Sequence, residues 1–230
     1  MIEFLSSDLT LLTLTVGLFC LGGAIYRRTH SPLLHPVLLT FVAVIAFLST
    51  SGIPYARYRE ATKVLDFALG LSVVSLGYLL YEQAERLRRS LVPVATATLA
   101  GCVTGVLSVV YIAKMCGAER MLLHSIAPKS VTVPIAVSIS GPLGGDVSIT
   151  SVVVFCVGIF GSLSGEWILR RCGIRDREAR GFAMGAAAHG IGTARAVEMG
   201  AVEGALSGLA MALMGVATAL LLPLMEKFLY

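Results

Sequence analysis

The chain has 230 residues, of which 56% are hydrophobic and 14% charged, and its mean hydropathy of +0.84 excludes an ordinary soluble domain. Its net charge of +4 is small and lies between apolar runs, so it indicates membrane topology and excludes a nucleic-acid partner. The five cysteines have neither metal-ligand spacing nor an even count, and we expect them to be packing residues. These features predict an all-α polytopic membrane protein, one domain over residues 1–230, with no metal and no cofactor.

Six apolar runs are long enough to cross a lipid bilayer, since a spanning helix needs roughly 20 apolar residues. In chain order they are Asp8–Tyr26, Leu33–Ser51, Thr62–Tyr81, Leu91–Ala113, Val147–Leu169 and Ala205–Met225. Glu3 and Asp8 precede the first run, while Arg27 and Arg28 follow it, which reverses the charge order of a signal peptide. We therefore expect a first span that leaves the N-terminus outside.

Two shorter segments, Pro128–Gly141 and Gly181–Gly200, are interrupted by Pro or Gly and carry ionisable or hydroxyl side chains. Backbone freed at membrane depth must be buried in protein or line a wet cavity, and an ionisable group there is costly enough to suggest a site. A pair of interrupted segments is typical of transporters with discontinuous helices. We expect about six full spans plus two broken or re-entrant segments, about seven to eight membrane segments, in an inverted-repeat architecture.

The basic residues set the expected orientation, because cytoplasmic loops are enriched in Lys and Arg. With the N-terminus outside, ten of the 18 basic residues fall inside, namely Arg27, Arg28, Arg86, Arg88, Arg89, Arg170, Arg171, Arg175, Arg177 and Arg180. This assignment requires the first broken segment to enter from outside and return there, and the second to enter from inside. The two helix openings are then expected to meet near the middle of the membrane.

The first broken segment contains a helix opening that can attract an anion. Ser130 or Thr132 can cap this helix, and Pro134 falls in its first turn, where a missing N–H has no cost. A helix N-terminus offers free N–H groups and a partial positive charge, to which Lys129 adds a full charge. Alternatively, Lys129 only extends to the outer membrane interface.

The second broken segment contains another helix opening with a stronger anion ligand. Gly190 and Gly192 permit an unwound turn, and Thr193 can cap the helix that carries Arg195 and Glu198. The planar guanidinium of Arg195 can hold a carboxylate by two parallel hydrogen bonds. Together, the two openings predict a binding site for a small carboxylate near mid-membrane.

Other interpretations of these residues stay open. An imidazole titrates near neutral pH, so His189 can carry a coupled proton, or it can be a hydrogen-bonded core residue. Arg195 and Glu198, three residues apart, can simply neutralise each other. A Ser164–His189 dyad is an alternative, but no protease or phosphate-loop motif is present and we expect no enzyme. We expect close helix packing at the small residues Gly181, Gly185, Ala186, Ala187 and Ala188.

Three further features have structural interpretations. Asp146 is expected to be the N-cap of the following span, and Glu166 to pair with Arg170 at i,i+4 spacing. The segment Tyr55–Lys63 is too polar to span a membrane, so we expect it to lie at the interface with Tyr55 and Tyr58 in the aromatic belt.

At these two broken segments the chain resembles the LrgB/CidB family. The residues that carry the resemblance are Pro128-Lys129-Ser130-Val131-Thr132-Val133-Pro134-Ile135-Ala136, Ala179-Arg180-Gly181, His189-Gly190-Ile191-Gly192-Thr193-Ala194-Arg195-Ala196 and Val202-Glu203-Gly204-Ala205. The resemblance implies a bacterial inner-membrane protein made with a small LrgA/CidA-type membrane partner and described as a modulator of murein hydrolase activity and autolysis. Relatives include the plastidial glycolate/glycerate translocator. The family tends to have Gly-Pro near Gly70-Leu71-Ser72, where this chain lacks Pro, so a break there is not expected.

Two functions from different classes follow. The first is a transporter or facilitator of small monocarboxylates of the glycolate, glycerate, lactate or pyruvate type. The second is a non-transporting, holin/antiholin-like membrane protein that regulates lysis by assembling with a partner or with further copies of itself. Costly ionisable groups on broken helices favour the first, because an assembly protein has no need of them.

Overall fold

The structure is a computed structural model, and it describes residues 5–29, 34, 36–65, 67–68, 71, 78, 81 and 91–229. All regular elements within these residues are helices. The chain divides into two compact units, Met1–Ser72 and Val73–Tyr230. Most of the expected third span, Thr62–Tyr81, lies outside the described residues, as do Arg86, Arg88, Arg89 and most of Gly70–Ser72.

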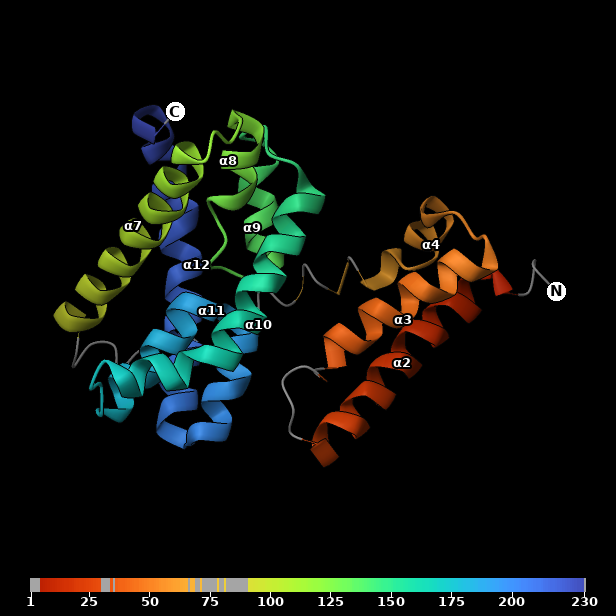
Figure 1. Cartoon of the computed structure of the whole chain (residues 1–230), viewed down its shortest axis with the longest axis horizontal. Helices are drawn as coiled ribbons and strands as arrows, with labels where there is room; N and C mark the ends of the chain where they lie inside the picture. The colour runs from red at the N-terminus through yellow and green to blue at the C-terminus, as the bar shows by residue number, and fades with distance from the viewer. Residues whose placement is uncertain are drawn as a thin grey trace. The chain divides into compact units, whose positions relative to one another are not determined.

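Among its described residues, the first unit contains two apolar helices and one short polar helix (Figure 1, red to orange). These are α2 (Asp8–Thr29), α3 (Pro36–Ser51) and α4 (Tyr55–Ala61). The polar helix is tied to α2 by an ion pair of 2.6 Å between Arg57 Nη2 and Asp8 Oδ1. Tyr58 packs beside the small core of this unit, and its hydroxyl lies 3.0 Å from Thr15 Oγ1. Tyr58 is therefore packed within the first unit, while Tyr55 is 68% exposed.

The second unit contains six helices among its described residues. They are α7 (Leu91–Met115), α8 (Arg120–Ile126), α9 (Val133–Ser140), α10 (Val147–Arg171), α11 (Arg177–Met199) and α12 (Ala201–Leu229). Among the described residues, α2, α7, α10 and α12 are long and apolar enough to cross a membrane, whereas α3 has 16 residues. These five helices coincide with five of the six expected spans.

The first broken segment, Pro128–Gly141, forms a turn and the short helix α9, and together with the preceding helix α8 it makes a hairpin. The chain leaves α8 through a turn and starts α9 after Thr132, with Pro134 in the first helical turn as expected. After α9 the chain returns to α8, because the Asp146 N–H donates to Ser125 Oγ at 2.7 Å. Gly145 allows this approach, since a Cβ there would lie 2.9 Å from the Ser125 nitrogen. Asp146 Oδ1 also accepts from the Ile149 N–H, which confirms the predicted N-cap of α10.

The second broken segment is α11, which is interrupted at Ala188 (φ −130°, ψ 17°) and His189 (φ 41°, ψ −134°). The predicted unwound turn at Gly190 and Gly192 is therefore wrong by one or two residues. Gly192 instead permits the two halves to lie against each other, because a Cβ there would lie 2.7 Å from Met184 O. The positive φ falls on His189, a backbone conformation that costs energy in any residue except glycine.

The two halves of α11 also form a hairpin that returns to its starting end. Arg177, the first residue of α11, has its Nε 3.2 Å from Oε1 of Glu203 near the start of α12. Gly181 and Gly185 lie one helical turn apart and contact the α12 backbone at Glu203 and Ser207, so any side chain there would collide with backbone. Close packing by small residues is confirmed at these two positions.

Helix α10 connects the two hairpins end to end (Figure 1). Its N-cap, Asp146, lies beside α8, whereas Glu166 near its other end forms ion pairs with Arg180 and Arg195 of α11. The hairpins therefore start from opposite ends of α10. We call the end where α10 finishes and α11 begins the basic end, since it carries Arg170, Arg171, Arg175, Arg177 and Arg180.

Candidate functional site

Two cavities flank the first half of α11. One, of about 850 Å³, lies between α7 and α11 and is lined by Gly101, Gly105, Ser130 and Phe182 among others. The other, of about 560 Å³, lies between α10 and α11. Three residues line both cavities: Lys129, Ala183 and Ala187. The turn before α9 and the end of the first half of α11 therefore border the same two cavities.

Lys129 is the charged residue common to both cavities. It is half-buried, and its Nζ donates to Ser130 Oγ at 3.0 Å. No carboxylate among the described residues forms an ion pair with it. The neighbours Ala127 and Val131 are buried in separate apolar clusters, which anchor the turn on either side. Among the described residues, Lys129 thus brings to both cavities a positive charge that no ion pair neutralises, and the Glu178 carboxylate also lines the larger cavity.

The opening of α9 has spare hydrogen-bonding capacity. Thr132 occupies the N-cap position, but its side chain makes no capping bond, and its Oγ1 is a buried atom with no hydrogen-bond partner among the described residues. Ser130 lies two residues before the N-cap position, and its hydroxyl oxygen accepts from Lys129. The predicted side-chain cap is therefore wrong for both residues. The first N–H groups of α9 keep the partial positive charge of a helix N-terminus.

Arg195 has a different environment from Lys129. Its Nη1 lies 2.7 Å from Glu198 Oε2 and its Nη2 lies 2.8 Å from Glu166 Oε2. Glu166 also pairs with Arg170 at 2.7 Å, which confirms the predicted i,i+4 pair. The sequence predicts a carboxylate ligand for Arg195, and the structure supplies two that both belong to the protein. This agrees with the alternative in which Arg195 and Glu198 neutralise each other, and Arg195 lines neither cavity.

The remaining predicted residues of the second segment have structural partners. Thr193 does not cap a helix, since its hydroxyl donates to His189 O at 2.8 Å and lies 2.9 Å from Ser207 Oγ of α12. His189 is buried, and its Nε2 lies 2.9 Å from Val154 O. Ser164 donates instead to Phe160 O at 2.6 Å, so the Ser164 and His189 side chains have separate partners. His189 therefore matches the alternative of a hydrogen-bonded core residue.

The residues of α7 that line the larger cavity were not identified as site residues from the sequence. Ala97, Gly101 and Gly105 are spaced four apart, which places them on one face of a helix and leaves that face smooth. This spacing is visible in the sequence and is the signal that could have indicated the cavity wall. A similar stripe on α10, Gly158, Gly161 and Gly165, packs against α11.

Comparisons with known proteins show the family to which the chain belongs. The model of the LrgB-like family matches residues 15–228. The chain belongs to the LrgB-like family. Holin-like protein CidB of Staphylococcus epidermidis is 31% identical over 99% of both chains, and CidB of Staphylococcus aureus is 28% identical over 96% of this chain and 97% of its own. An uncharacterized protein, YxaC of Bacillus subtilis, is 34% identical over 90% of both chains. No solved structure matches the chain.

Proposed function

We propose that this membrane protein is a carrier of small monocarboxylates of the glycolate, glycerate, lactate or pyruvate type, and that Lys129 holds the carboxylate. The observation that carries the proposal is the half-buried Lys129 ammonium, which lines two cavities and pairs with no carboxylate among the described residues. A charge in such a place is costly unless an anion compensates it. A substrate carboxylate supplies that anion.

Neighbouring groups can add neutral hydrogen bonds to this anion. Ser130 accepts from Lys129 through its oxygen, so its own hydroxyl hydrogen is free to donate to a substrate. The N-terminus of α9 adds its partial positive charge at the same turn. Arg195 has no direct part in binding, since its guanidinium is held by Glu166 and Glu198.

The orientation in the membrane is part of the proposal. Five arginines gather at the basic end, and cytoplasmic loops are enriched in such residues. We therefore place the basic end at the cytoplasmic face of a bacterial inner membrane, with the N-terminus outside. The α8–α9 hairpin then enters from outside and the α11 hairpin from inside, as in transporters with inverted repeats.

Uptake of labelled glycolate, lactate and pyruvate into proteoliposomes tests the proposal, with and without a co-expressed LrgA/CidA-type partner. Lys129→Met keeps the length of the side chain without its charge. Because a charge-assisted hydrogen bond contributes roughly 1.5–3 kcal/mol, we expect uptake to fall about tenfold to a hundredfold. Lys63→Met is the matched control. It removes a lysine that follows the end of α4 and whose side chain is 72% exposed, and it should leave uptake unchanged. Full uptake by folded Lys129→Met protein contradicts the assignment.

The names of the relatives favour a second candidate function, a holin-like protein that controls lysis by assembling in the membrane. A holin-like assembly releases trapped solutes without selecting among them, and it has no requirement for Lys129. Leakage of calcein from the same proteoliposomes distinguishes the two candidates. Lys129-independent leakage without saturable carboxylate uptake supports the holin-like function, and saturable, Lys129-dependent uptake from tight vesicles supports the carrier.

A further inference from the structure

Both cavities lie toward the basic end, and tightly packed apolar layers fill the other end of the unit. Along α12, Leu206 lines the larger cavity, Met214 belongs to one buried apolar cluster and Leu222 to the next. At 1.5 Å of rise per residue, Leu222 lies about 24 Å along the helix from Leu206. A solute held at Lys129 therefore has open space on one side and close-packed side chains on the other.

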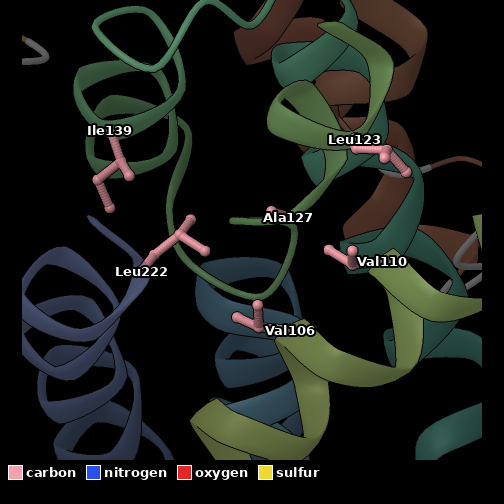
Figure 2. Packing of buried hydrophobic residues seen from close by; sticks show 6 residues of the cluster. All are labelled: Val106, Val110, Leu123, Ala127, Ile139 and Leu222. Carbon is pink, nitrogen blue, oxygen red and sulfur yellow. The ribbon is translucent and has the colours of Figure 1, made fainter. Parts of the chain in front are cut away.

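The farther cluster joins four helices and the turn after α8 (Figure 2). We call it the plug; its buried members are Val106, Val110, Leu123, Ala127, Ile139 and Leu222. Half of them, Leu123, Ala127 and Ile139, come from the α8–α9 hairpin. Neither cavity includes a plug residue. Ala127 and Lys129 share one turn, so the hairpin that carries the cation also closes the path beyond it.

The same hairpin is linked to α12 by an exposed ion pair at its rim, between Arg120 and Glu226, with the buried imidazole of His124 nearby. Glu226 Oε1 lies 3.4 Å from Arg120 Nη2 and 3.8 Å from His124 Nε2, both of α8. Glycines with positive φ flank the hairpin on both sides, Gly117 (78°) before α8 and Gly144 (85°) after α9. Such turns are where hinges absorb backbone rotation. The α8–α9 hairpin is also held to the start of α10 by the Asp146–Ser125 hydrogen bond and the Gly145 contact with α8, and its rotation must break both. The α11 hairpin is held to α12 by glycine–backbone contacts at two positions one helical turn apart.

We propose that the α8–α9 hairpin is the gate at the end of the unit opposite the basic end, with the plug as its seal and Glu226 as its latch. The inference rests on the proposed carrier function, for which it names the moving element. Rotation of the hairpin about the turns at Gly117 and Gly144 withdraws three of the plug side chains and exposes Lys129 to the far side. In the conformation described, this gate is closed and the cavities lie on the side of the plug toward the basic end.

Thiol labelling tests the gate without any substrate. In a variant whose five native cysteines are replaced by serine, Thr104→Cys places one thiol in the wall of the larger cavity. In proteoliposomes of known orientation, a membrane-impermeant maleimide should label it from the basic end only. Adding Leu222→Ser to loosen the plug should raise labelling from the far side at least tenfold, and Glu226→Gln, which removes an exposed ion pair, should raise it by a smaller factor. Leu224→Ser, on the 66% exposed side chain two residues along α12, is the matched control and should not change it.

The outcomes separate the gate from the carrier. Far-side labelling of the otherwise unchanged Thr104→Cys protein, or no increase in folded Leu222→Ser and Glu226→Gln variants, overturns the gate even if Lys129-dependent uptake is intact. If the labelling pattern is as expected but carboxylate uptake is the same in the wild type and in Lys129→Met, the proposed carrier function is overturned instead. Size-exclusion profiles establish that each variant is folded before its labelling is measured.

Discussion

The two hairpins of the second unit each carry a basic residue, and they differ in whether an ion pair neutralises its charge. In the α8–α9 hairpin, Lys129 lies half-buried beside two cavities, and within the part of the chain that the structure describes its hydrogen-bond partner is a serine hydroxyl. In the α11 hairpin, Arg195 is neutralised by Glu198 and Glu166. A broken helix with a basic residue is therefore not by itself an anion site. The decisive feature is whether the protein already supplies the counter-charge.

The largest expected effect concerns the way in which the α11 hairpin is held. Gly185→Leu places a side chain against the Ser207 backbone, which cannot move aside without separating α11 from α12. We expect loss of folded, monodisperse protein, because overpacking against backbone is strongly destabilising. Gly208→Leu, at a position with nothing within 4 Å, is the control. Equal yields of the two variants in size-exclusion chromatography contradict this packing.

Removing Arg195 should affect stability more than transport. Arg195→Ala leaves Glu166 and Glu198 without this partner. The Arg195 side chain is 33% exposed, so the lost ion pairs are partly buried. We expect a loss of stability between the ~1 kcal/mol of an exposed ion pair and the ~3 kcal/mol of a buried one, with uptake per folded molecule retained. Arg195→Lys should restore part of the stability. Thermal denaturation and uptake, measured on the same preparation, check this expectation. Loss of uptake by a stable Arg195→Ala protein would contradict it and indicate that Arg195 binds the substrate.

Filling the larger cavity should have a smaller effect on transport without unfolding the protein. A Cβ at Gly105 lies 3.6 Å from Ser130 Oγ, an ordinary van der Waals distance, so Gly105→Leu extends into open space beside Lys129. We expect uptake to fall several-fold while thermal stability changes little. Gly17→Leu serves as the control, because a Cβ at Gly17 has nothing within 4 Å and this glycine lies in the first unit. Unchanged uptake by Gly105→Leu means that the substrate does not use this cavity.

The smallest expected effect is at Thr193. Thr193→Val keeps the shape of the side chain but removes its hydrogen bonds to Ser207 and to the His189 carbonyl. We expect a loss of about 1 kcal/mol in the free energy of unfolding and no change in uptake. Chemical denaturation in detergent measures the first quantity. Strongly impaired uptake at wild-type stability contradicts the structural role assigned to this hydroxyl.

The sequence predicted the features of this fold that depend on neighbouring residues. The helix opening with Pro134, the Asp146 cap and the Glu166–Arg170 pair are local patterns, and the structure confirms them. The position of the second break was missed because the positive φ falls on His189, whereas residue preferences point to the glycines that follow.

The counter-charges of the site could not be predicted in the same way. Glu166 lies 29 residues from Arg195 in the chain, and only the packing of α10 against α11 brings the two together. The sequence therefore ranked Arg195 above Lys129 as an anion ligand, since guanidinium suits a carboxylate better than ammonium does. That preference holds for a free arginine, and this arginine is already paired.

Equilibrium binding tests the central claim most directly, because it needs neither membrane orientation nor a gate. Labelled pyruvate and glycolate are titrated against purified wild-type, Lys129→Met and Arg195→Met proteins of verified folding. The account predicts saturable binding to the wild type and to Arg195→Met, and a loss of about tenfold or more in affinity for Lys129→Met. Binding that survives Lys129→Met but disappears with Arg195→Met would contradict it and place the substrate at the α11 hairpin.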